Sequence, residues 1–247
     1  MPTPVRMYQE EMHKNLGFFA TWLPGDHLEL GDVGRLEAGR FRKQTSLQEL
    51  GFPVTSGPRG AAQDLQYTST SGTEFAIAND AKAAGSVGLQ ANIEIKFNRS
   101  GAFLFHASRA ENIRLENTLE LANHIVPASK TNRWRMDWYL VEAIYVADCA
   151  TDIVSEDNSA AMVIRATADG ELGSIPLANP RVRLNISSSR GRMVHVLSGR
   201  RTRPLYSCIR LKESWFKEPS LVPVRGTSSD PSELPFVRPR ISDLLES

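Results

Sequence analysis

Apolar side chains fill both faces of the stretch over residues 138–154. In an extended chain, successive side chains point to opposite faces. Over 138–146 both sets are mostly apolar, and Glu142 alone interrupts them. A strand of this kind is typical of the centre of a sheet. A second β-rich segment, 160–168, follows turn-like residues, so we expect the remaining elements to pack on this sheet or extend it.

Alternation of apolar and polar residues predicts two hairpins and a shorter pair of strands. The first hairpin covers 87–113, with its turn at 98–101, and the second pairs 182–186 with 193–197. The shorter pair covers 28–41, where Gly39 can take the positive φ of a tight turn. The alternating apolar residues of the first hairpin are Ile93, Ile95, Phe97, Phe103 and Phe105.

Helical spacing is present in two places. Over 5–16, Met7, Met12 and Leu16 fall near one face, and Gly17 suits the end of the helix. Over 115–126 a second helix is expected, which Pro127 would stop. Between them, residues 65–86 are small and polar and predict weakly packed strand or mobile loop.

From residue 218 onward the chain becomes rich in proline, with Ser and Gly between the prolines. This composition is typical of a linker or tail. The tail ends in the apolar residues Ile241, Leu244 and Leu245, which could dock it. The sequence therefore predicts one α+β domain over 1–217, with a twisted, mostly antiparallel central sheet and peripheral helices, followed by a tail over 218–247.

Composition narrows the class of protein further. Two cysteines, Cys149 and Cys208, provide neither a disulfide framework nor a metal site. They favour a reducing, cytoplasmic setting, with Cys149 as a buried, inert thiol. The N-terminal residues carry no apolar core of a signal peptide, and no window approaches 18 uninterrupted apolar residues.

Catalytic and metal-binding motifs do not emerge from the residue pattern. The sequence contains no nucleophile elbow, phosphate-binding loop, dinucleotide fingerprint or zinc-protease motif. Its histidines share no metal-ligand spacing; they are His13, His27, His106, His124 and His195. We expect a protein that is not an enzyme and has no catalytic residues, metal or cofactor. Glu142 is interpreted as a margin residue paired with an arginine.

Positive charge is concentrated in residues 181–212, which contain no Asp or Glu although the whole chain has a net charge of only +1. The arginines considered for binding are Arg181, Arg183, Arg190, Arg192, Arg200, Arg201 and Arg203. Such a segment suits an anionic membrane surface or nucleic-acid phosphate. A solvated face that pairs with acids elsewhere explains it equally well.

The order of these elements resembles that of the pore-forming domain of gasdermins, in particular the compact bacterial ones with a short C-terminal tail. The similarity spans about residues 5–216 and rests on element order: a short amphipathic helix, an apolar strand, a hairpin, a helix, the strand over 138–144 and a second hairpin. In bacterial members a cysteine at the start is available for lipidation, whereas here the first cysteine is Cys149. The resemblance does not extend to that feature.

The resemblance implies a cytoplasmic, autoinhibited monomer that a protease activates by removing its C-terminal part. The freed domain would bind acidic lipid at the inner face of the cell membrane, oligomerise and convert its hairpins into membrane-spanning strands, in antiviral defence by cell death. By position, Met7, Met12, Leu16 and the arginines above would contact membrane. The first hairpin's apolar residues would span it, and Phe18, Phe19 and Trp22 would be core or interface. Ile241, Leu244 and Leu245 would anchor an inhibitory tail.

Two other functions fit the same sequence. The chain could be a non-enzymatic β-sandwich module in a multiprotein assembly, defence-associated or structural. It could also bind nucleic acid through residues 181–212, although Tyr206 is the only aromatic residue available there for stacking.

Overall fold

The computed structural model describes residues 3–21, 27–37, 39–78, 89–168, 183–198, 201–212 and 235–245. Within these residues the chain forms three helices and a mostly antiparallel set of strands, which confirms the α+β class. It divides into two compact units, each assembled from three separate stretches of sequence. The sequence predicted one domain over 1–217 and gave no sign of this division.

The first unit takes residues 1–27, 60–112 and 145–205. It contains helix α1 (Pro4–Leu16) and most of the strands. These strands are β1 (Phe19–Ala20), β4 (Gln63–Thr68), β5 (Thr73–Ala78), β6 (Leu89–Phe97), β9 (Cys149–Ser155), β10 (Ala160–Ala168), β11 (Arg183–Arg190) and β12 (Met193–Ser198). Three longer strands, β7 (Phe103–Arg114), β8 (Tyr139–Ala147) and β13 (Thr202–Leu211), contribute residues to both units.

The second unit takes residues 28–59, 113–144 and 206–247. Its own elements are β2 (Asp32–Glu37), β3 (Arg40–Ser46), α2 (Thr118–Lys130), β14 (Phe236–Val237) and α3 (Ile241–Leu245). Leu121 and Ile125 of α2 pack into a core with Trp134, Leu140 and other buried residues from β2, β13 and β14. The predicted pair of strands over 28–41 is confirmed as β2 and β3, with Gly39 at a φ of 77°.

The central strand predicted from the apolar run is confirmed and is broken once. β8 lies between β13 and β7, and β9 lies between β7 and β12. Asp148 separates β8 from β9, and its backbone N–H still donates to Ser108 O of β7 at 3.0 Å. Both faces of β8 and β9 are largely buried, as the two-sided apolar pattern requires.

Helix α1 confirms the first predicted helix. Thr3 caps its start, because the Thr3 side-chain oxygen accepts a hydrogen bond from Arg6 N at 3.3 Å. Gly17, in the left-handed conformation at φ 69°, donates its N–H to His13 O and ends the helix as expected. The predicted apolar strand that follows is only two residues long in β1.

The second predicted helix is wrong at both ends. Leu115 is held in a β-bridge with Ser56, so α2 begins at Thr118. Pro127 does not stop it, and the helix runs to Lys130. A proline removes one backbone hydrogen bond, and burial of Ile125 and Ala128 on either side of Pro127 offsets that loss.

Candidate functional site

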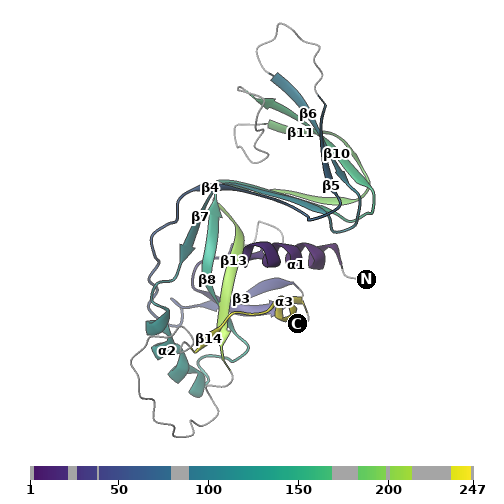
Figure 1. Cartoon of the computed structure of the whole chain (residues 1–247). Helices are drawn as coiled ribbons and strands as arrows, with labels where there is room; N and C mark the ends of the chain where they lie inside the picture. Colours follow the sequence, from purple (N-terminus) through teal and green to yellow (C-terminus); the bar gives the residue numbers. More distant parts are fainter. Residues whose placement is uncertain are drawn as a thin grey trace, which may run out of the picture. The chain divides into compact units, whose positions relative to one another are not determined.

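Two arrays of four strands in the first unit have the same strand order. One array runs β4-β7-β9-β12 and the other β5-β6-β10-β11, both antiparallel. Each strand of one array continues along the chain, through a short turn, into the strand at the same place in the other. The two arrays are therefore one four-stranded ribbon that bends sharply (Figure 1).

The bend is a line of four turns, which we name the crease: residues 69–72, 98–102, 156–159 and 191–192. The registers place the strand ends beside these turns next to one another. Phe97 of β6 is opposite both Thr73 of β5 and Ala160 of β10, and on the other side of the crease Phe103 is opposite Val154. The four turns consequently lie in a row across the ribbon.

This topology corrects the two hairpins predicted from alternation. Strand β6 uses both edges to pair with β5 and β10, while β7 pairs with β4 and β9. Likewise β11 pairs with β10 and β12 with β9. The turn residues bond across to neighbouring turns and strands, as in Asn98 N to Gly72 O at 2.7 Å and Gly101 N to Ser155 O at 2.8 Å. Residues 65–86, predicted to be weakly packed, provide β4 and β5 in their described part.

Two glycines fit their crease turns for steric reasons. Gly101 has a φ of 75°, and a Cβ there would lie 2.9 Å from Met7 Cβ and Sδ of α1. Gly191 has a φ of 82°, and its Cβ would lie 3.0 Å from Ala160 Cα and Ser159 O. L-residues rarely adopt such φ values, so glycine permits both the turn and the close approach.

An apolar core fills the inside of the bend. Ile95 and Phe97 of β6 and Met162 of β10 pack with Leu104 of β7 and Ile153 of β9. Ile95, Phe97, Leu104 and Ile153 have no exposed surface. At about 25 cal/mol per Å² of apolar surface removed from water, burial of such residues favours the bent form of the ribbon.

Helix α1 lies on the opposite face of β7 and β9. The ring of Tyr8 meets the ring of Phe103 edge-on, with 4.8 Å between centroids. The Tyr8 hydroxyl donates to Asp152 Oδ1 of β9 at 2.8 Å. The Gln9 side chain bonds both backbone groups of Ala20, donating at 2.7 Å and accepting at 3.1 Å. The position of the helix is therefore fixed by polar side chains and by apolar side chains.

Asp152 is a buried carboxyl group with an altered affinity for protons. Burial raises the pKa of Asp152 to about 7, and the hydrogen bond from Tyr8 partly opposes this. Burial, together with the nearby Asp152, raises the pKa of Tyr8 well above its usual value. At neutral pH the hydroxyl is the donor and the carboxyl group is partly protonated.

In the second unit, the C-terminal segment docks on the end of β13. Strand β14 pairs with it at Leu211–Phe236 and Arg210–Val237. Phe236 enters the core of that unit. Arg238 Nη2 lies 3.0 Å from Glu142 Oε1, and Ser207 also donates to this oxygen at 3.0 Å. The prediction that Glu142 pairs with an arginine is confirmed, but its predicted position at the margin of the sheet is wrong, because β8 lies between β13 and β7.

The residues predicted for the tail anchor lie in α3, where Ile241 is partly buried. Leu244 and Leu245 end that helix, but their side chains lie outside the described set. Sequence reasoning missed Phe236, a buried side chain of this segment. Its position among prolines hid it, because no periodic pattern surrounds it.

The residues predicted to contact membrane differ in how far their side chains are buried. Met12 is fully buried, while Met7 and Leu16 are partly buried. Arg190 and Arg192 are exposed at one end of the crease, and Arg201 is exposed between β12 and β13. Arg203 is partly buried in β13, and Arg183 belongs to β11. Arg181, Arg200 and Trp22 lie outside the described residues, as does the whole segment over 213–234. Phe18 and Phe19 are buried.

The predicted spanning residues Ile95, Phe97, Phe103 and Phe105 are all fully buried. They do not form one face of one hairpin: the first two belong to the inner core, and Phe103 contacts α1. Ile93 is opposite Ile164 of β10 in the register, and its side chain is not among those described.

Groups with catalytic potential are dispersed. In the part of the chain that the structure describes, no three His, Cys, Asp or Glu residues are placed to hold a metal ion. Cys149 is buried beside Ser108, 3.7 Å from its hydroxyl, and burial raises the pKa of the Cys149 thiol. His106 is buried, and burial lowers its pKa. Among the described helices, none has the length and apolar character needed to cross a membrane.

No protein-family model matches this chain, and no curated protein sequence is significantly similar to it.

Proposed function

We propose that this chain is a gasdermin-like membrane pore-forming protein, kept inactive by its C-terminal segment and activated by proteolysis. The observation that carries the proposal is the creased ribbon. Its two arrays share one strand order, so the four strands could straighten without exchanging partners. The resemblance in element order supports the same function. The remainder of the proposal, a cytoplasmic protein that moves to the inner face of the membrane in bacterial defence or cell death, rests on that resemblance.

The lengths of the strands suit this conversion. A strand that crosses a bilayer as part of a barrel needs about 9–11 residues. β6 and β10 have nine residues each, and β11 has eight. Joined across the crease to β7, β9 and β12, each becomes longer than a bilayer requires. Straightening would produce two long hairpins, 63–78 with 89–114 and 149–168 with 183–198.

The side chains of β6 support a membrane-spanning role. Ile95 and Phe97 are buried, whereas Glu94 is partly exposed and Lys96 is exposed. In a barrel, apolar residues face lipid and polar residues face the lumen. If the core inside the bend opened, Ile95 and Phe97 would need a new apolar environment, and lipid would supply one.

The docking of the C-terminal segment supports control by proteolysis. Phe236 packs in a core, and Arg238 and Asp243 form ion pairs with Glu142 and Arg210. A protease that removed this segment would expose the apolar surface that Phe236 covers. Arg190, Arg192 and Arg201, all exposed, supply positive charge for anionic lipid.

Dye release from liposomes tests the proposal. We expect protein lacking residues 221–247 to release dye from vesicles that contain anionic lipid, and the full-length chain to release none. Vesicles made only of zwitterionic lipid are the control and should leak far less. Absence of leakage from the shortened protein, shown by circular dichroism to be folded, would overturn the proposal and favour the interaction-module alternative.

A further inference from the structure

Polar contacts connect the four turns of the crease in order. Arg99, in the second turn, donates from Nε to Ser71 O at 3.0 Å and to Ser71 Oγ at 3.1 Å in the first. Ser100 N donates to Asn158 Oδ1 of the third turn at 3.0 Å. Asp157 accepts from Arg192 N of the fourth at 2.6 Å. Each turn is thus tied to the next by at least one side chain.

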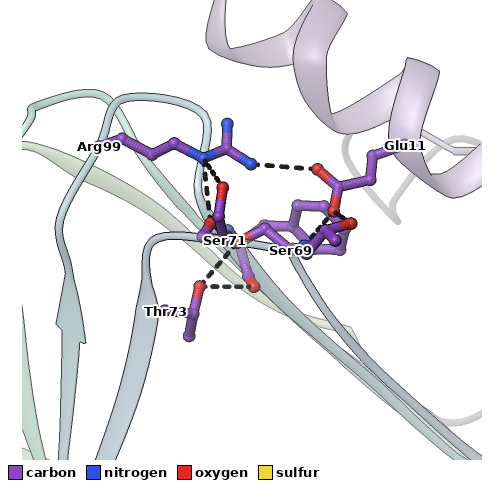
Figure 2. Close-up of polar contacts among 7 residues, drawn as sticks. Glu11, Ser69, Ser71, Thr73 and Arg99 are labelled. Atoms are coloured by element: carbon purple, nitrogen blue, oxygen red, sulfur yellow. Dashed lines mark hydrogen bonds and ion pairs between the residues drawn. The ribbon is translucent and has the colours of Figure 1, made fainter.

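Glu11 of α1 joins the first two turns from outside the ribbon (Figure 2). One carboxylate oxygen accepts from both the backbone N–H and the hydroxyl of Thr70. The other lies 3.1 Å from Arg99 Nη2. One carboxylate therefore bonds both turns, and the Nε–H of Arg99 bonds Ser71.

The side chains of this pair are less exposed to water than those of the exposed pair Arg6–Glu10 on the same helix. The side chains of Glu11 and Arg99 are only 16% and 27% exposed. The pair Arg6–Glu10, on the same helix, is 41% and 42% exposed. Partly buried ion pairs are screened less by water and salt than exposed ones, so Glu11 contributes more to the position of α1 than Glu10 does.

The neighbouring residues of α1 contact the same part of the ribbon. Met7 lies against Gly101 of the second turn, and Tyr8 contacts Phe103 immediately after it. The first turn is also bonded to β7, because the backbone N–H of Ser69 donates to Phe103 O at 3.0 Å. Helix α1 thus covers one half of the crease, and it meets the turns with the apolar Met7 as well as the charged Glu11.

We propose that α1 is a latch on the crease: Glu11 holds the first two turns together, and release of the helix is what frees the ribbon to straighten. The latch is a property of the folded protein in solution. Its link to pore formation rests on the proposed function, and the tests below separate the two.

Amide hydrogen exchange of the full-length chain tests the latch. Glu11→Ala removes the bonds to both turns, and we expect exchange in 69–72 and 98–102 to become about tenfold faster, since charge-assisted hydrogen bonds contribute at least that factor. The matched control is Glu10→Ala, one residue away on the same helix, whose ion pair does not reach the crease. It should leave exchange in both turns unchanged.

A double-mutant cycle shows whether the two side chains act together. Arg99→Ala should accelerate the same turns, and the combined variant should fall short of the sum of the two single changes, because both remove the Glu11–Arg99 pair while each also removes its own bonds to the first turn. Glu11→Gln is the gentler variant, since it keeps an acceptor for Thr70 but loses the charge facing Arg99. Its effect should lie between those of the wild type and Glu11→Ala. Equal exchange in the Glu11 and Glu10 variants, or an increase spread evenly over the chain and including α2, would overturn the latch.

Leakage measurements then test the link to function. In protein lacking residues 221–247, Glu11→Ala should make dye release from anionic vesicles faster, while Glu10→Ala should not. Faster exchange without faster leakage would retain the latch and reject its link to pore formation. Absence of leakage from every shortened variant would reject the proposed function and leave the exchange result to stand.

Discussion

At the scale of single residues, the contact between Tyr8 and Asp152 places a titratable group under α1. The carboxyl group is buried and accepts a hydrogen bond from the Tyr8 hydroxyl at 2.8 Å. A buried carboxyl group is disfavoured in its charged form. Docking of the helix is consequently coupled to the protonation of a single side chain.

This coupling predicts a dependence of stability on pH. The pKa of Asp152 is about 7 in the folded protein, raised from 3.8, so between these values the folded state binds the proton more tightly than the unfolded state. The contribution of Asp152 to the free energy of unfolding is therefore greatest below about pH 4, falls as the pH rises to about 7, and is constant above.

Urea unfolding at a series of pH values measures this contribution as the difference between the wild type and Asp152→Asn, whose side chain does not titrate. The difference should change between pH 4 and 7 in the direction just given. Tyr8→Phe removes a donor that stabilises the carboxylate, so it should extend the pH-dependent range upward. A wild-type curve parallel to that of Asp152→Asn would contradict the assignment.

Gly101 provides a second test at this scale. Gly101→Ala forces an L-residue into φ 75° and brings its Cβ within 2.9 Å of Met7. The matched control is Gly17→Ala, which has a similar φ of 69° but no atom within 4 Å of the new Cβ. We expect a loss of about 1–2 kcal/mol of unfolding free energy for the control, from the backbone alone, and a clearly greater loss for Gly101→Ala. Equal losses in the two variants would show that the Met7 side chain moves aside with no loss of unfolding free energy.

At the scale of elements, alternation of residues predicted the strands but not their partners. Ile95, Lys96 and Phe97 have the pattern of a half-buried strand, and β6 is one. The same pattern does not say which strand pairs with it. The hairpin turn predicted at 98–101 includes Gly101, and such a glycine permits a crease as readily as a hairpin turn. The contacts of Glu11 could not be foreseen, because Thr70 and Arg99 are far from it in sequence.

The C-terminal segment allows a prediction about a short element. Phe236 is buried, whereas its neighbour Val237 is 38% exposed. Phe236→Ala should detach β14 and α3 from β13, because Phe→Ala changes in cores cost about 3–5 kcal/mol. Limited proteolysis should then cut residues 235–245 faster than in the wild type.

The control is Val237→Ala, on the same two-residue strand but facing outward, which should leave the cutting rate unchanged. Under the proposed function, full-length Phe236→Ala should also leak anionic vesicles without proteolysis. If the protease cut Phe236→Ala at the wild-type rate, the ion pairs of Arg238 and Asp243 would be sufficient to hold the segment without the Phe236 side chain.

At the scale of the whole molecule, the chain passes through each unit three times. Strands β7, β8 and β13 take part in both, so neither unit corresponds to a continuous segment. Composition and periodicity describe residues that are neighbours in sequence. They could therefore predict the α+β class but not the division into two units. The boundary expected near residue 217 followed a change of composition, which is a different signal from contacts between distant residues.

The aligned crease also determines the thermodynamic character of straightening. The strands retain their partners, so few backbone hydrogen bonds break, while the apolar core around Phe97 and Leu104 becomes exposed to water. Exposure of apolar surface carries little enthalpy near room temperature and a positive change in heat capacity. The free energy that opposes straightening in solution therefore decreases on cooling. Under the proposed function, cooling would therefore favour the straight form of this ribbon, whereas heat produces an unfolded chain.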